Sequence, residues 1–150
     1  MTAFITSCGG FLLAVLWMDL MFDVQVRPHR DAPALPEPVL SSIAAYYRRV
    51  TTEADPMGRL VGLVMGAAAF ATFIQLFHGA GPFALRVTSL LLLAAPLVLA
   101  ARRVFPNAVR LGARRDPPET QSALARSICR DHLLCLAAIV AFVAIEIARG

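Results

Sequence analysis

The sequence contains no lysine, so all fourteen of its basic residues are arginine, and only 16% of its 150 residues are charged. Soluble domains carry about 25% charged residues. Hydrophobic residues make up 58% of the chain and its mean hydropathy is +0.67. This apolar excess is too large for one soluble core, and it excludes intrinsic disorder, which requires few apolar residues. Although the net charge is +4, the same excess argues against a nucleic-acid partner.

Sequence motifs of soluble enzymes are also missing. The chain has no phosphate-binding glycine loop, dinucleotide glycine motif, nucleophile elbow or HExxH sequence, and its three cysteines form no CxxC pair. Cys129, His132 and Cys135 are spaced by three and spread over about 120° of a helix, which is too wide for one tetrahedral metal site. We therefore predict no metal site, and the sequence favours a non-catalytic role.

Cofactor ligands are equally scarce. His78 and His132 fall at opposite ends of their predicted helices, and His29 falls in a loop. Two axial haem ligands must lie at one depth, so a haem held within this chain alone is not expected. No cofactor is predicted, although a haem or quinone shared with a partner subunit remains open.

Four long apolar runs are present, at about 4–22, 60–77, 83–101 and 128–147. A membrane-spanning helix needs about 20 apolar residues, and backbone groups in lipid must be hydrogen-bonded within the segment. The sequence therefore predicts an all-α membrane protein, a single transmembrane domain over 1–150 that forms an antiparallel bundle of four helices. The first run has no basic residue before it and no convincing cleavage site, so we interpret it as a retained anchor.

Arginine placement predicts the orientation, because positive residues in short loops stay in the cytoplasm. Eleven of the fourteen arginines fall in the connections between spans one and two and between spans three and four, and Arg130 falls at the adjoining start of span four; Arg86 and Arg149 fall on the other side. The loops 24–59 and 102–127 are therefore expected in the cytoplasm and both termini outside it. In a bacterium the protein would lie in the inner membrane, with anionic lipid headgroups as partners of these arginines.

The two cytoplasmic loops carry helix signals of their own. Four prolines between 27 and 38 predict an extended segment. Apolar residues at helical spacing then predict an amphipathic helix over 39–50, with Tyr46 and Tyr47 at headgroup level if it lies on the membrane; packing against the end of the bundle is the alternative. Asp116 before two prolines predicts the start of a helix that runs from Pro117 to about Ala148, and 78–82 is expected to be a tight turn.

Small residues predict where helices approach one another. Gly58, Gly62 and Gly66 recur every four residues, a spacing that lets membrane helices pack closely. Thr6, Gly10 and Ala14 offer a matching face on the first helix, and a partner subunit or a second copy is the alternative. Pro96 is expected to kink the third helix.

Ionisable and polar residues at membrane depth are candidates for function, and they fall into two predicted clusters. Each also has a structural interpretation, as ion pairs at helix ends or as hydrogen bonds between helices. The cytoplasmic cluster contains Asp19, Asp23, Arg130 and His132, with Asp131 beside them. The outer cluster contains Gln75, His78, Arg86 and Glu146, with Arg86 expected to pair with Glu146.

Small size, missing catalytic motifs, the glycine face and the arginine-rich surface favour an accessory or structural subunit of a larger membrane complex. The alternative is a small membrane enzyme or carrier that handles a lipid, a quinone or an ion through its polar clusters.

Overall fold

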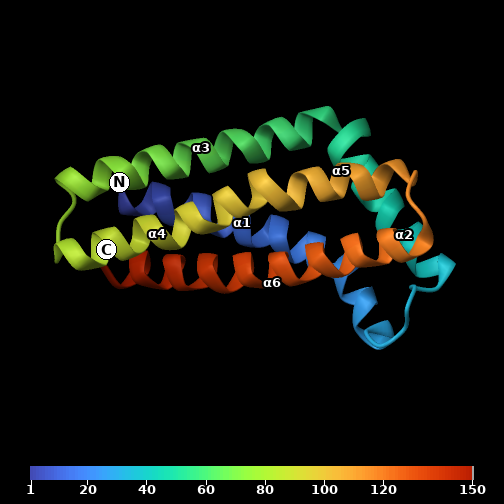
Figure 1. The fold of residues 1–150 in the computed structure, drawn as a ribbon. Coiled ribbons are helices and arrows are strands. Elements are labelled where there is room, and N and C mark those ends of the chain that lie inside the picture. Colours follow the sequence, from blue (N-terminus) through green and yellow to red (C-terminus); the bar gives the residue numbers. More distant parts are fainter. Residues whose placement is uncertain (150) are drawn as a thin grey trace.

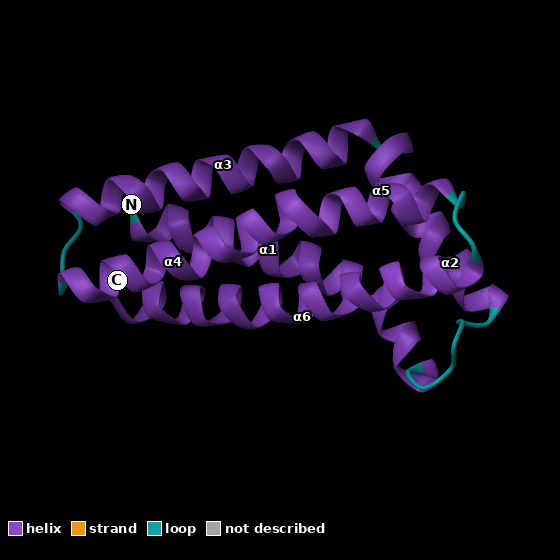
Figure 2. Ribbon diagram, viewed as in Figure 1, coloured by secondary structure: helices purple, strands orange, loops and turns teal. Residues whose placement is uncertain are grey.

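Helices account for nearly all of the chain in a computed structural model, which describes residues 1–149 and every side chain among them except that of Asp55. Four long helices alternate in direction (Figure 1): α1 (Thr2–Asp23), α3 (Asp55–His78), α4 (Phe83–Leu99) and α6 (Pro118–Arg149). Short helical segments and loops connect them (Figure 2): η1 (Val24–His29), α2 (Glu37–Arg48), η2 (Arg49–Glu53), η3 (Ala100–Val104) and α5 (Phe105–Ala113). Residues 1–149 contain no strand, which confirms the all-helical class.

Four stretches are long and apolar enough to cross a membrane: Thr2–His29, Pro56–His78, Phe83–Ala113 and Pro118–Arg149. Many of their large apolar side chains point outward; Leu63 is 71% exposed, Phe70 68% and Trp17 65%. So much outward apolar surface is unusual for a soluble monomer. The helices therefore indicate an integral membrane protein. The third stretch is longer than predicted, because α4 continues through η3 into α5.

The four long helices pack around a shared core, in which α1 and α4 each contact both α3 and α6. Ile5, Leu93, Ile139 and Phe142 are among its buried side chains. At Gly9 an added Cβ would lie 2.5 Å from Cγ2 of Val143. A glycine at this position therefore lets α1 and α6 approach closely.

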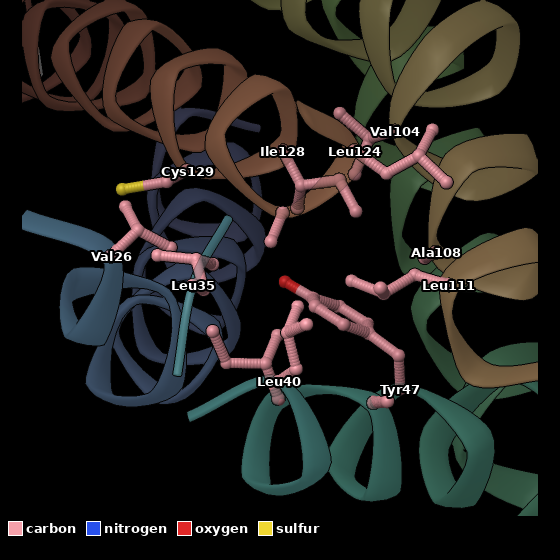
Figure 3. Close-up of a cluster of buried hydrophobic side chains, with 13 residues drawn as sticks. Val26, Leu35, Leu40, Tyr47, Val104, Ala108, Leu111, Leu124, Ile128 and Cys129 are labelled. Carbon is pink, nitrogen blue, oxygen red and sulfur yellow. The ribbon is translucent and has the colours of Figure 1, made fainter. Parts of the chain in front are cut away.

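Both chain termini lie at one end of the molecule, which we call the terminal end, and α2 and α5 lie at the other, the connector end (Figure 1). The connector end has a hydrophobic core of its own (Figure 3), built from α2, α5, the first turns of α6 and neighbouring segments. Helix α5 was not predicted. Its buried Ala108 and Leu111 do follow helical spacing with Val104 of η3 before them, but the surrounding arginines and Pro106 mask that pattern.

Helix α2 packs against the connector end, which is the second of the two arrangements that the sequence predicted. Ile43, Ala44 and Tyr47 are buried in the connector core, as packing against the end of the bundle requires. An added Cβ at Gly112 of α5 would lie 2.7 Å from the backbone nitrogen of Arg48. The two helices therefore touch backbone to backbone, and this contact fixes the position of Tyr47.

The segment 27–38, which was predicted to be extended, is helical at its beginning and at its end. Pro28 lies inside η1, a short 3₁₀ helix that continues from α1. Proline has a helical φ and lacks only one donor, so a single tight turn accommodates it. Pro96 lies inside α4, three residues before its end, where the helix widens into the π-helical segment η3. Helix α6 begins at Pro118 and ends at Arg149, close to its predicted bounds.

Candidate functional site

His132 of α6 lies between the two carboxylates of α1. Its Nδ1 atom is 2.6 Å from Oδ2 of Asp23, and its Nε2 atom is 3.7 Å from Oδ2 of Asp19. Asp23 is fully buried and His132 is 5% exposed. Because Asp19 and Asp23 are four residues apart, both face α6 from one side of α1. The structure thus brings together three of the four residues of the predicted cytoplasmic cluster, at the connector end.

Two tyrosines of α2 complete this group. The Tyr47 hydroxyl donates to Oδ1 of Asp23 and the Tyr46 hydroxyl to Oδ1 of Asp19, both at 2.6 Å. The ring of Phe22 stacks on Tyr46 with its centroid 4.1 Å away. The sequence analysis missed both tyrosines as site residues. Two adjacent tyrosines opposite two carboxylates one turn apart were the available signal. We call Asp19, Asp23, Tyr46, Tyr47 and His132 the five-residue site.

The hydrogen bonds assign roles to the ring nitrogens of His132. An ionised carboxylate only accepts hydrogen bonds, so the short contact with Asp23 assigns the proton of a neutral imidazole to Nδ1. The Nε2 atom then carries a lone pair and can accept a proton. Asp23 therefore orients the ring, as a carboxylate commonly does for a functional histidine.

Both tyrosines are held in the protonated state. Burial, reinforced by the negative charges of Asp23 and Asp19, raises the pKa of Tyr47 far above its usual range. Burial and the neighbouring Asp19 carboxylate likewise raise the pKa of Tyr46. The two hydroxyls therefore act as fixed hydrogen-bond donors that hold the carboxylates in place.

The site faces a cavity of about 510 Å³ between the helices. Asp19, Tyr46, Tyr47 and His132 contribute to its wall, and most of the remaining lining is apolar. A second, smaller cavity of about 100 Å³ is lined by Leu12 and Ile139 among other residues. Asp19 and His132 line both cavities. They are therefore the groups best placed to meet a molecule inside either one.

Arg130, the fourth residue of the predicted cluster, points elsewhere. Its Nε atom lies 3.3 Å from Asp131, whose side chain is 1% exposed. Arg103 of η3 approaches the same carboxylate to 3.3 Å. Asp131 is thus neutralised by two arginines, and neither arginine joins the five-residue site.

At the terminal end the structure brings together only part of the predicted outer cluster. Glu146 is fully buried; it accepts a hydrogen bond from Gln75 at 3.0 Å and pairs with Arg149 at 2.9 Å. The expected pair between Arg86 and Glu146 does not form, because Arg86 donates to the backbone oxygen of Leu76 at 2.8 Å. His78 is exposed at the end of α3. Arg149 lies three residues after Glu146 on the same helix, so it reaches this carboxylate more easily than Arg86 does.

The glycines of α3 do not pack against another helix. An added Cβ at Gly62 or Gly66 meets nothing within 4 Å, and one at Gly58 meets only the backbone oxygen of Val50, at 3.8 Å. Gly10 on α1 is equally open. The predicted close packing between these glycines and α1 is therefore wrong, although α1 and α3 are neighbours. Instead, Gly58 and Gly62 line the larger cavity and leave room in it.

Metal-ligating side chains do not gather anywhere in the part of the chain that the structure describes: no three His, Cys, Asp or Glu residues form a group able to hold a metal ion. Cys8, Cys129 and Cys135 are buried free thiols.

The chain matches no protein-family model, no curated protein and no solved structure. Its function must therefore be inferred from its own residues.

Proposed function

We propose that this membrane protein binds an amphiphilic molecule whose polar head reaches Asp19 and His132 in the larger cavity. One observation carries the proposal: these two residues line both cavities, whose other walls are mainly apolar. Binding pockets for small molecules typically combine apolar walls with a few converging polar groups. A cavity of about 510 Å³ lies within the usual range of about 300–1,000 Å³ for such pockets.

The chemistry of the site selects the head group. When the imidazole is neutral and its Nδ1 proton is bound to Asp23, the Nε2 lone pair and the Asp19 carboxylate are both hydrogen-bond acceptors. A head group that donates a hydrogen bond satisfies them, and a quinol hydroxyl is such a group. The apolar part of the ligand would lie along Val61 and Met65 of α3 and Ala100 of η3. This proposal develops the quinone or lipid alternative, and it requires no catalytic step.

A matched pair of ligands tests the proposal. The full-length protein in mild detergent is mixed with a short-chain quinol or with the corresponding quinone, and thermal stabilisation is measured, since a ligand that binds only the folded state raises its stability. The quinol is expected to stabilise the protein more than the quinone, because only the quinol donates hydrogen bonds. Equal stabilisation by the two forms, or none, would refute the proposed head group.

Two glycine substitutions on α3 provide the matched variants. Gly62→Leu fills the larger cavity, whereas Gly66→Leu places the same side chain outside it. We expect Gly62→Leu to weaken quinol binding at least tenfold and Gly66→Leu to leave it unchanged. Equal binding by the two variants would place the ligand somewhere other than in this cavity.

A subunit role in a larger membrane complex is the second candidate, and the open face of α3 favours it. Gly66 has free space around it, and the nearby Leu63 and Phe70 are 71% and 68% exposed. Small residues at such a face suit contact with another membrane helix. In this case Gly66→Leu, and not a cavity-filling change, should reduce the size of the native complex extracted in mild detergent.

A further inference from the structure

Four arginines surround a groove at the connector end that shares no lining residue with either cavity of the five-residue site. Arg27 lies in η1 and Arg30 directly follows it, and Arg126 and Arg130 come from α6, one turn apart. The groove has a volume of about 460 Å³, and no acidic residue lines it. Such a concentration of guanidinium groups attracts anions, and phosphate above all, because the planar fork of an arginine can bind two phosphate oxygens at once.

These arginines retain capacity for a ligand. Arg27 makes no hydrogen bond or ion pair with the side chains and backbone that the structure describes. Arg30 meets only Asp31, at 3.3 Å, and both side chains are more than 80% exposed. Arg126 uses one nitrogen for the backbone oxygens of His29 and Ala32, while its buried Nε has no partner within the described residues. The hydrogen bond from Arg126 to the backbone oxygen of His29 also holds η1 against α6. This side of the groove therefore has a fixed geometry.

The floor of the groove indicates what kind of phosphate it takes. Leu133 and Leu134 line it beside the arginines and are 37% and 58% exposed. Leu133 is also the residue at which the uninterrupted apolar run of α6 begins. Charged groups therefore meet apolar surface at the level where lipid headgroups meet hydrocarbon. A free phosphate ion would use only the arginines, whereas a phospholipid would use the arginines and the two leucines.

We propose that this groove binds the phosphate headgroup of an anionic phospholipid, with an acyl chain along Leu133 and Leu134. Arg27 and Arg30 would supply the charge, together with Arg130, which also pairs with Asp131, and Arg126 would position η1. The lipid site is separate from the cavity at His132, so either proposal can fail without the other.

The test compares lipids and variants in the full-length protein. Dissociation constants are measured in detergent for phosphatidylglycerol and for phosphatidylcholine with the same acyl chains. Arg27→Gln combined with Arg30→Gln removes two charges from the groove without removing the link made by Arg126. Arg102→Gln combined with Arg115→Gln is the control, since both residues are exposed and lie outside the groove.

We expect phosphatidylglycerol to bind more tightly than phosphatidylcholine and the groove variant to weaken its binding about fivefold for each arginine removed, as expected for a basic residue near an anionic lipid surface. The control variant should bind like the unchanged protein. An equal loss in both variants would show unspecific attraction to basic residues and would overturn the proposal. Complete displacement of the lipid by millimolar inorganic phosphate would overturn the lipid assignment, because the acyl contact would then contribute nothing.

Discussion

The Nδ1 atom of His132 lies 2.6 Å from Oδ2 of Asp23, although the two residues are 109 positions apart in the chain. This contact joins α6 to α1 at the point where both helices reach the connector end. Tyr47 of α2 donates to the other oxygen of Asp23. One buried carboxylate thus links three helices. The position of the His132 ring toward the cavity therefore depends on the packing of the connector end.

The tyrosines provide a direct probe of this arrangement, because Tyr46 and Tyr47 are the only two in the chain. Their raised pKa values mean that the folded protein keeps both hydroxyls protonated. At about pH 11, roughly one unit above the usual tyrosine pKa of about 10, the near-ultraviolet absorbance of tyrosinate should be absent from the folded protein. It should appear when the protein is unfolded at the same pH.

The same shifts give the direction of a pH effect on stability. Because the pKa of each tyrosine is higher in the folded than in the unfolded state, the contribution to stability is complete below about pH 10 and is lost as the pH rises toward the folded-state pKa. Unfolding followed at several alkaline pH values checks this. Tyrosinate absorbance that develops near pH 10 in the folded protein would show that the hydroxyls are not buried against carboxylates.

Removal of a single hydroxyl separates the two tyrosines. Tyr47→Phe leaves the fully buried Asp23 with one donor fewer, and a lost hydrogen bond to a buried charged group costs about 1–3 kcal/mol. Tyr46→Phe should cost less, because Asp19 and Tyr46 are only partly buried. Thermal unfolding in one detergent measures both free energies, and the opposite order would contradict the assigned burial.

Part of this site could be predicted from the sequence. The spacing of Asp19 and Asp23 and the position of His132 at the start of an apolar run place all three residues at one end of the molecule. The tyrosines could not be assigned in the same way, since Tyr at a helix end is equally suited to a membrane surface. Their direction depends on the backbone contact between Gly112 and Arg48, which the pattern of α2 alone does not reveal.

The fold, like the site, could be predicted from the sequence only in part. Long apolar runs predicted the four long helices, because length and composition decide that property. The glycines of α3 gave a wrong prediction of close packing against α1, because a small residue permits a close contact between helices without requiring it. Gly9 makes the close contact of α1, with Val143 of α6, while Gly10 next to it is open. Which of two adjacent glycines contacts a neighbouring helix depends on the rotation of α1 about its axis. Because α1 has apolar residues on all sides, its sequence does not determine that rotation.

These two glycines give a matched pair of substitutions. Gly9→Ala places a methyl group 2.5 Å from a methyl of Val143, a stiff β-branched side chain. We expect a loss of about 1–3 kcal/mol from overpacking. Gly10→Ala has free space and should stabilise the helix by about 0.5–1 kcal/mol. Equal effects on thermal unfolding would show that α1 is rotated about its axis relative to this structure.

At the terminal end, Glu146 and Arg149 should behave as one unit. The side chains are 0% and 7% exposed and their charged atoms are 2.9 Å apart. Removing one partner of a buried pair leaves the other charge uncompensated, at a cost of about 3–5 kcal/mol. Glu146→Gln and Arg149→Gln are each expected to destabilise the protein, and the double variant should lose less than the sum. Additive losses in a double-mutant cycle would show that the two groups do not interact.

The orientation in the membrane can be tested at two positions of the chain. All arginines except Arg86 and Arg149 belong to the connector end, and short loops rich in arginine stay in the cytoplasm. We therefore expect a reporter inserted in the exposed loop at Asp31 to be cytoplasmic and one fused after Arg149 to lie outside the cytoplasm. Both reporters must give opposite signals, because α6 alone separates the connector end from the C-terminus. A cytoplasmic C-terminal reporter would reverse the orientation, and the arginine groove would then face the opposite leaflet.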